Sequence, residues 1–242
     1  MKTAHVVRSL GTLALALAMA ANLAHAGTPN ASPGASHIAS PHSSAFGKTL
    51  AEWMGVYWRW YYTGADLAQS KVGNVQLMPL PVGDQVSGSW TPNDPAVLVG
   101  QLEITLPPGT PFVLPEFSWV GELYEDGSVD PPMDNDVALN AASINLTIDG
   151  KTVISDANKA AFYVPPTDFD PIVEYSEPTD YGSVGDVFYQ GVAFVSLPLT
   201  PGVHVIHLVE PIILEPGDYV GLPDGLGVVY DNTWIVTVKA GK

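Results

Sequence analysis

Proline–proline and proline–glycine pairs interrupt this chain of 242 residues at short intervals, and they limit what it can fold into. Proline removes a backbone hydrogen-bond donor, and glycine adopts turn conformations that other residues avoid. With 22 prolines and 23 glycines, few stretches are long enough for helices. The pattern therefore predicts many short strands joined by turns. The main breaks are Pro107-Pro108-Gly109, Pro131-Pro132, Pro165-Pro166, Pro201-Gly202 and Pro216-Gly217.

Between these breaks, apolar and polar residues alternate with the period of two that marks a half-buried strand. Residues 101–106 and 144–148 show this alternation clearly. Asp149-Gly150 then supplies a two-residue turn into residues 151–154, which predicts a hairpin. We therefore expect an all-β fold, a jelly-roll-like β-sandwich. Further strands are expected at residues 192–197, 203–209 and 233–239.

One segment near the N-terminus, at about residues 49–63, has the pattern of a helix. Thr49 and Glu52 have the spacing of a capping box, and Gly64 suits the C-terminal end. Aromatic and aliphatic residues fill nearly the whole circumference of this helix, apart from a narrow polar strip that includes Glu52 and Arg59. A helix that is apolar nearly all round is normally buried, so we expect it to pack on the sandwich.

The rings of this helix have two possible roles. Burying an aromatic ring is favourable, so we expect Trp53, Tyr57 and Trp60 to belong mainly to the core. Rings at the rim of the core can instead stack on a flat ligand such as a sugar. The candidate ligand-binding residues are Trp58, Tyr62 and Trp119.

The first 26 residues have the organisation of a signal peptide. Lys2 and Arg8 precede an apolar run over residues 10–23, and Ala24-His25-Ala26 forms a cleavage site. The apolar run is too short to span a membrane, which needs roughly 20 helical residues. We therefore expect a secreted or periplasmic protein without membrane insertion.

Residues 27–45 are small, polar and proline-rich, which predicts a flexible lead-in. The remaining residues, 46–242, are expected to form a single sandwich domain that includes the N-terminal helix. Their number suits one β domain with a sizeable core.

The charge of the chain excludes some classes of partner. Nine lysines and arginines stand against 25 aspartates and glutamates, giving a formal net charge of −16 at pH 7. Such a charge repels nucleic acids and anionic lipid surfaces. The chain has no cysteine, so its stability does not come from disulfides although export would permit them.

Three blocks of sequence, spread over most of the expected domain, resemble those of exported bacterial proteins of unknown function. That family has a G-K-[ST]-x-x-E-W helix start followed by W-x-W, then a P-x-G-x-x-F-x-x-P strand and a late P-L-x-P-G-x-H-x-I strand. The resemblance implies a β-rich extracytoplasmic fold and brings no reaction or catalytic residue. The matching blocks are residues 47–53 with Trp58 and Trp60, residues 107–115, and residues 198–206.

Glu116, Glu122 and His204 are the candidates for acid–base chemistry. The two glutamates flank an aromatic strand, but six residues of strand place them ~20 Å apart. Paired carboxyls in glycosidases lie about 5–9.5 Å apart, so another strand would have to supply a partner. His204 and His207 face opposite sides of one strand, and neither has an identifiable partner.

Residues 125–136 are rich in the oxygen ligands that calcium prefers. Their spacing does not match the EF-hand template, and a solvated acidic turn is the simpler explanation. No other metal or cofactor is expected. The candidate calcium ligands are Asp126, Asp130, Asp134 and Asp136.

No nucleophile, phosphate-binding, dinucleotide or zinc motif is present. We therefore expect a non-enzymatic binding or structural module for an unknown small molecule or polysaccharide, for example a carbohydrate or another extracellular polymer. The alternative is a secreted hydrolase or lyase that uses carboxylate or histidine acid–base chemistry.

Overall fold

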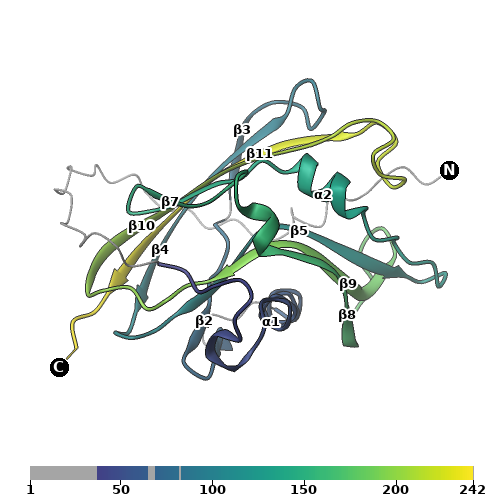
Figure 1. Ribbon diagram of the computed structural model, residues 1–242. Helices are drawn as coiled ribbons and strands as arrows, with labels where there is room; N and C mark the ends of the chain where they lie inside the picture. The colour runs from purple at the N-terminus through teal and green to yellow at the C-terminus, as the bar shows by residue number, and fades with distance from the viewer. Residues whose placement is uncertain (1–36, 65–68, 82, 242) are drawn as a thin grey trace.

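The computed structural model describes residues 37–64, 69–81 and 83–241. In this part of the chain, two β-sheets face each other and helix α1 (Leu50–Tyr62) packs on the outer side of one of them (Figure 1). This confirms the predicted sandwich with an N-terminal helix. The predicted signal peptide, residues 1–26, lies outside the described residues.

The sheet beside α1, called sheet I, has the strand order β1-β2-β5-β9-β8. Sheet II has the order β3-β4-β11-β10-β6-β7. The strands of sheet I are β1 (Lys71–Val72), β2 (Val75–Leu77), β5 (Phe112–Tyr124), β8 (Tyr163–Glu174) and β9 (Ser183–Val195). Those of sheet II are β3 (Asp84–Ser87), β4 (Ala96–Leu106), β6 (Asn145–Ile148), β7 (Lys151–Ser155), β10 (Gly202–Leu214) and β11 (Leu226–Val238).

Two of the strand pairs are parallel. The last strand, β11, runs parallel to β4 over eleven residue pairs, and β2 runs parallel to the start of β5. The other pairs are antiparallel. A jelly roll is built from antiparallel strands, so the parallel pairs set this sandwich apart from the expected jelly-roll-like arrangement.

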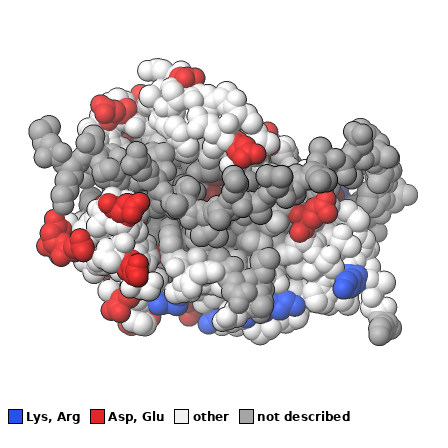
Figure 2. Space-filling view, turned by 180° about the vertical axis from the view of Figure 1, so that it is seen from behind, with Lys and Arg blue, Asp and Glu red and all other residues white. Residues whose placement is uncertain are grey.

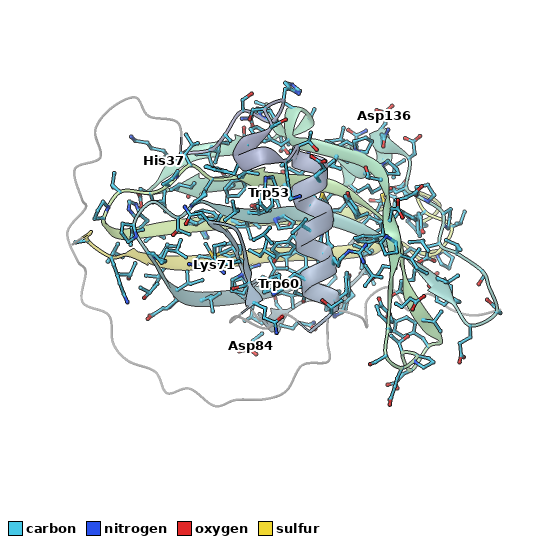
Figure 3. The ribbon with its side chains drawn as sticks, turned by 90° about the horizontal axis from the view of Figure 1, so that it is seen from below. His37, Trp53, Trp60, Lys71, Asp84 and Asp136 are labelled. Carbon is cyan, nitrogen blue, oxygen red and sulfur yellow. The ribbon has the colours of Figure 1, made fainter. Side chains whose placement is uncertain are left out.

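Helix α1 begins and ends within one residue of the predicted range. The Thr49 amide donates to Glu52 Oε2 (2.6 Å) and the Glu52 amide donates to Thr49 Oγ1 (3.3 Å), which completes the capping box. Trp53 and Tyr57 are at most 1% exposed and Trp60 is 9% exposed, as expected for core residues. Figure 3 shows α1 lying across the strands of the sandwich.

Glu52 and Arg59, on the polar strip of α1, have separate structural partners. Glu52 caps the helix, while the Arg59 guanidinium donates to the backbone carbonyls of Pro171 and Ile172 in β8. The same guanidinium lies over the Phe169 ring, 5.6 Å from its centroid. Arg59 therefore ties α1 to the edge of sheet I.

The Asp149-Gly150 turn joins β6 to β7 as predicted. Asp149 and Gly150 have φ angles of 52° and 73°. A two-residue turn of this handedness needs positive φ at both positions, which explains the choice of aspartate followed by glycine.

Part of the predicted lead-in, at Ile38 and Ala39, pairs with the end of sheet I. Ile38 is 8% exposed and pairs with Ser196 just after β9, and the Ala39 amide donates to the Val195 carbonyl (2.9 Å). Small polar composition predicted flexibility, but backbone pairing with a distant strand gives this segment a partner. Residues 27–36 lie outside the described residues.

A second helix, α2 (Asn135–Ala141), was not predicted. Asp134 caps it by accepting from the amides of Asp136 and Val137 (2.9 and 3.3 Å). The surrounding segment bridges the two sheets, because the Met133 amide donates to Gln190 of β9 and the Ser143 amide donates to Pro211 of β10.

One predicted break lies inside a strand. Pro165-Pro166 sits within β8, where the pairing with β9 is irregular between Val164 and Thr167. Strand β8 is at the edge of sheet I, a position that tolerates proline because half of its backbone donors need no sheet partner.

Acidic side chains are spread widely over the face seen in Figure 2, and the few lysines and arginines visible there lie along its lower edge. This distribution agrees with the net charge of −16. Among the helices of the described residues, none is long and apolar enough to cross a membrane.

Candidate functional site

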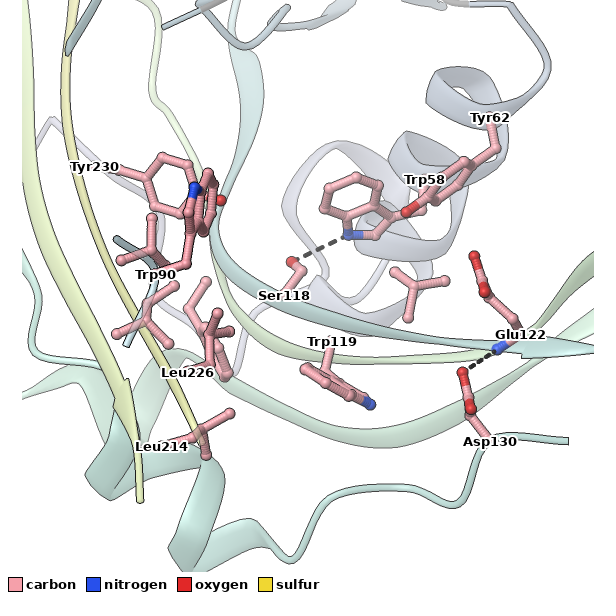
Figure 4. A pocket seen from close by; sticks show the side chains of 14 residues that line it. Trp58, Tyr62, Trp90, Ser118, Trp119, Glu122, Asp130, Leu214, Leu226 and Tyr230 are labelled. Carbon is pink, nitrogen blue, oxygen red and sulfur yellow. Dashed lines mark hydrogen bonds between the residues drawn. The ribbon is translucent and has the colours of Figure 1, made fainter. Parts of the chain in front are cut away.

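A pocket lies beside β5, between the end of α1 and the inner face of sheet II (Figure 4). Strand β2 pairs with β5 only at Phe112 and Val113, and residues 128–130 cover β5 again only from Glu122 onward. The stretch of β5 between these two contacts leaves room for the pocket. Its cavity volume is about 110 Å³, space for several water molecules or one small organic group.

Aromatic rings from four parts of the chain form the walls of the pocket. Helix α1 supplies Trp58 and Tyr62, β5 supplies Trp119, β11 supplies Tyr230, and the turn after β3 supplies Trp90. Aliphatic side chains of β10 and β11 complete the apolar wall. All three rings that the sequence suggested as ligand-binding, Trp58, Tyr62 and Trp119, therefore line one pocket.

Contacts with neighbouring side chains hold the rings in place. Trp58 Nε1 donates to Ser118 Oγ (3.1 Å), and Trp90 Nε1 donates to Gln85 Oε1 (3.0 Å). The Trp119 ring packs edge-on against Tyr219, with 4.5 Å between centroids. Trp58 and Trp119 are buried, whereas Trp90 is partly exposed.

Two carboxyl groups, Glu122 and Asp130, lie at one end of the pocket. The Tyr124 hydroxyl is 3.2 Å from Glu122 Oε2 and 3.2 Å from Asp130 Oδ1, so these oxygens are separated by at most twice that distance. The Tyr181 hydroxyl donates to Glu122 Oε1 (2.9 Å), and the Glu122 amide donates to Asp130 Oδ2 (3.2 Å). The tyrosines thus position both carboxyls.

Burial is the main influence on the ionisation of this acidic end. It raises the pKa of Glu122, against the hydrogen bond from Tyr181, and the charge of Asp130 raises it further. Burial also raises the pKa of Asp130. Asp186 lies opposite Glu122 on β9, and burial, with a contribution from the Glu122 charge, raises its pKa to about 7.

Glu116, one of the expected acid–base candidates, does not line this pocket. It occupies a bulge of β5, where the register with β9 shifts between Pro115 and Phe117. Neither of its buried carboxyl oxygens has a hydrogen-bond partner among the described residues. Burial raises the pKa of Glu116 well above its usual range, and the charge of Glu210 adds to this.

His204 is also remote from the pocket. Its Nδ1 lies 2.7 Å from Asp149 Oδ2 and its Nε2 lies 2.8 Å from the Thr200 carbonyl. Eight residues of β10 separate it from Ile212 in the pocket wall, roughly 26 Å of strand. These contacts connect β10 to the β6–β7 turn, which is a structural role.

The four candidate calcium ligands have different surroundings. Asp126 accepts from the amide and hydroxyl of Ser128, Asp134 caps α2, Asp136 is exposed in the first turn of α2, and Asp130 lies in the pocket. In the described part of the chain, no group of three or more histidines or carboxylates is placed to hold a metal ion. These contacts do not test calcium binding, which would require Asp126 and Asp134 to exchange their present hydrogen bonds for the ion.

Sequence reasoning missed Trp90, Tyr230 and the role of Asp130 in this pocket. Trp90 lies two residues after Gly88 in a turn-rich segment, so an aromatic residue beside a turn was the only signal in the sequence. Tyr230 lies in a regular strand with no distinguishing neighbour. Their approach to β5 depends on how distant strands pair.

Comparison with known proteins assigns this chain neither a family nor a function. No protein-family model matches the sequence, and a search of curated proteins finds no match. The pocket is therefore the feature from which a function can be inferred.

Proposed function

We propose that this protein is a non-enzymatic extracytoplasmic binding module whose pocket takes a ring of a carbohydrate or a similar polyol from an extracellular polymer. The observation that carries this proposal is the combination of aromatic walls with carboxyl groups at one end of a small pocket. A sugar ring presents an apolar face that stacks on aromatic rings and hydroxyls that donate to carboxylates.

The rigidity of the walls supports this proposal. Trp58 comes from a capped helix packed on sheet I, and Trp119 and Tyr230 come from long paired strands. Ligand pockets are usually formed before the ligand arrives, with a few fixed polar groups among apolar ones. An exported location accords with the signal peptide expected at residues 1–26 and remains part of the proposal.

A hydrolase or lyase is the second candidate, favoured by one observation. Glu122 and Asp130 both contact the Tyr124 hydroxyl, and both have raised pKa values, as a general acid requires. Against this, Glu122 accepts a hydrogen bond from Tyr181 and shares the Tyr124 hydroxyl with Asp130. This arrangement suits a fixed acceptor better than a proton donor.

An assay that records retention and turnover together distinguishes the two functions. The protein without residues 1–26 is incubated with a panel of insoluble and soluble polysaccharides, and both bound protein and released sugar are measured. We expect retention on at least one polymer without product release. Product release that Glu122→Gln abolishes while the fold stays intact would overturn the binding-module proposal in favour of the hydrolase or lyase.

A further inference from the structure

We infer that the ligand of this pocket is a cation, most simply a sugar ring that carries a protonated amine. The inference rests on the proposed function, because it names the chemical class of the ligand for the same pocket. Three features of the described residues lead to it: a shortage of hydrogen-bond donors at the acidic end, the absence of a basic side chain in the lining, and the aromatic faces opposite.

The acidic end has more acceptors than the described donors can satisfy. The Tyr124 hydroxyl contacts both Glu122 and Asp130 but carries a single hydrogen, so it donates to one of them at a time. Glu122 Oε1 accepts from Tyr181, and Asp130 Oδ2 accepts from the Glu122 amide. The Tyr124 hydrogen is therefore left to serve both Glu122 Oε2 and Asp130 Oδ1. A ligand that donates a hydrogen bond at this end would satisfy the remaining oxygen.

The charge at this end is also uncompensated. None of the residues that line the pocket is a lysine or an arginine. Buried carboxylates are normally paired, because the loss of water penalises the charged form. Burial has this effect on Glu122 and Asp130, so a bound cation would stabilise the ionised form of both.

The aromatic walls suit the same ligand. The face of a tryptophan or tyrosine ring is electrostatically negative and attracts an ammonium group, most strongly for tryptophan. Trp58, Trp90 and Trp119 surround the pocket on sides other than the acidic end (Figure 4). The net charge of −16 further raises the local concentration of cations around the protein.

Calorimetric titration with three matched sugars tests the inference: the tetramers of glucosamine, N-acetylglucosamine and glucose. The sugars share ring and length but differ in the group at one carbon, and only the first carries amines. Spermidine, an amine without a ring, is the fourth probe. Near neutral pH we expect the glucosamine tetramer to bind roughly tenfold more tightly than either neutral tetramer.

Glu122→Gln keeps the shape of the side chain and removes its charge. We expect it to weaken binding of the glucosamine tetramer roughly tenfold and binding of the neutral tetramers by a clearly smaller factor, because the glutamine oxygen still accepts from a sugar hydroxyl. Glu103→Gln, at an exposed position of β4 outside the pocket, is the matched control. It should change neither the affinity for the glucosamine tetramer nor that for the neutral tetramers. Circular dichroism checks the fold, and Asp130→Asn gives the same comparison if Glu122→Gln does not fold.

The outcomes separate the inference from the proposed function. Equal affinity for all three tetramers, or binding of the neutral sugars alone, would contradict a cationic ligand and leave the carbohydrate module standing. Binding of spermidine without any sugar would support the cation and refute the carbohydrate module. Binding of none of the four probes would overturn both.

Discussion

At the scale of single residues, the interior of the sandwich holds a carboxyl that its surroundings keep from ionising. Glu210 is 1% exposed on β10, beside Tyr230 of β11, and burial raises its pKa from 4.5 to about 8. A carboxyl with a raised pKa binds its proton more tightly in the folded state than in the unfolded chain. Its contribution to stability is therefore present at acidic pH and is lost as the pH rises through the folded-state value.

Glu210→Gln tests this effect. The free energy of unfolding of the unchanged protein should fall between about pH 5 and pH 8, because Glu210 and its neighbour Glu116 ionise in the unfolded chain over this range but stay protonated in the folded protein. The free energy of unfolding of the Glu210→Gln variant should fall less over the same pH range. The two decreases should differ by on the order of a few kcal/mol. Urea denaturation at several pH values measures this, and Glu103→Gln, at an exposed position, serves as control. Parallel curves for the variant and the unchanged protein would refute the assignment.

At the scale of elements, α1 lies so close to β9 that its glycine has no room for a side chain. A Cβ at Gly55 would lie 2.6 Å from the Tyr189 hydroxyl, which donates to the Ala51 carbonyl of the same helix (2.9 Å). Tyr189 is itself buried against Phe169. The contact between helix and sheet thus depends on one residue that helix propensity alone would disfavour.

Gly55→Ala should therefore destabilise the protein, although alanine is the better helix former by about 1 kcal/mol. Overpacking of this kind typically costs about 1–3 kcal/mol, which thermal unfolding would register as a lower melting temperature. The double variant with Tyr189→Phe removes the hydroxyl and should recover part of the loss. A Gly55→Ala variant that melts above the unchanged protein would show that the helix moves away freely.

The segment of residues 125–136 gives a prediction about calcium. Asp126 and Asp134 already accept hydrogen bonds from their own turn and helix. We therefore expect the same melting temperature in calcium and in a chelator. A clear increase with calcium, lost in the variant Asp130→Asn, would show instead that the segment rearranges to bind the ion.

At the scale of the whole molecule, the sequence predicted the features that depend on neighbouring residues. The capping box of Thr49 and Glu52 and the turn at Asp149-Gly150 are set by local chemistry, and the sandwich follows from the alternation along its strands. The packing of Ile38 against the sheet and the parallel pairing of β4 with β11 depend on distant partners. The pocket belongs to this second class, because its walls meet only once both sheets and α1 are in place.

Trp90→Ala compared with Phe46→Ala tests most directly whether the pocket binds the ligand. Both rings are at least partly exposed, but only Trp90 lines the pocket, while Phe46 lies at the opposite end of α1. The measurement is retention on a polysaccharide that the unchanged protein binds. Losing a stacking ring should weaken retention roughly tenfold for Trp90→Ala and leave Phe46→Ala unchanged, with both variants folded. Equal retention by both variants would contradict the assignment of ligand binding to this pocket.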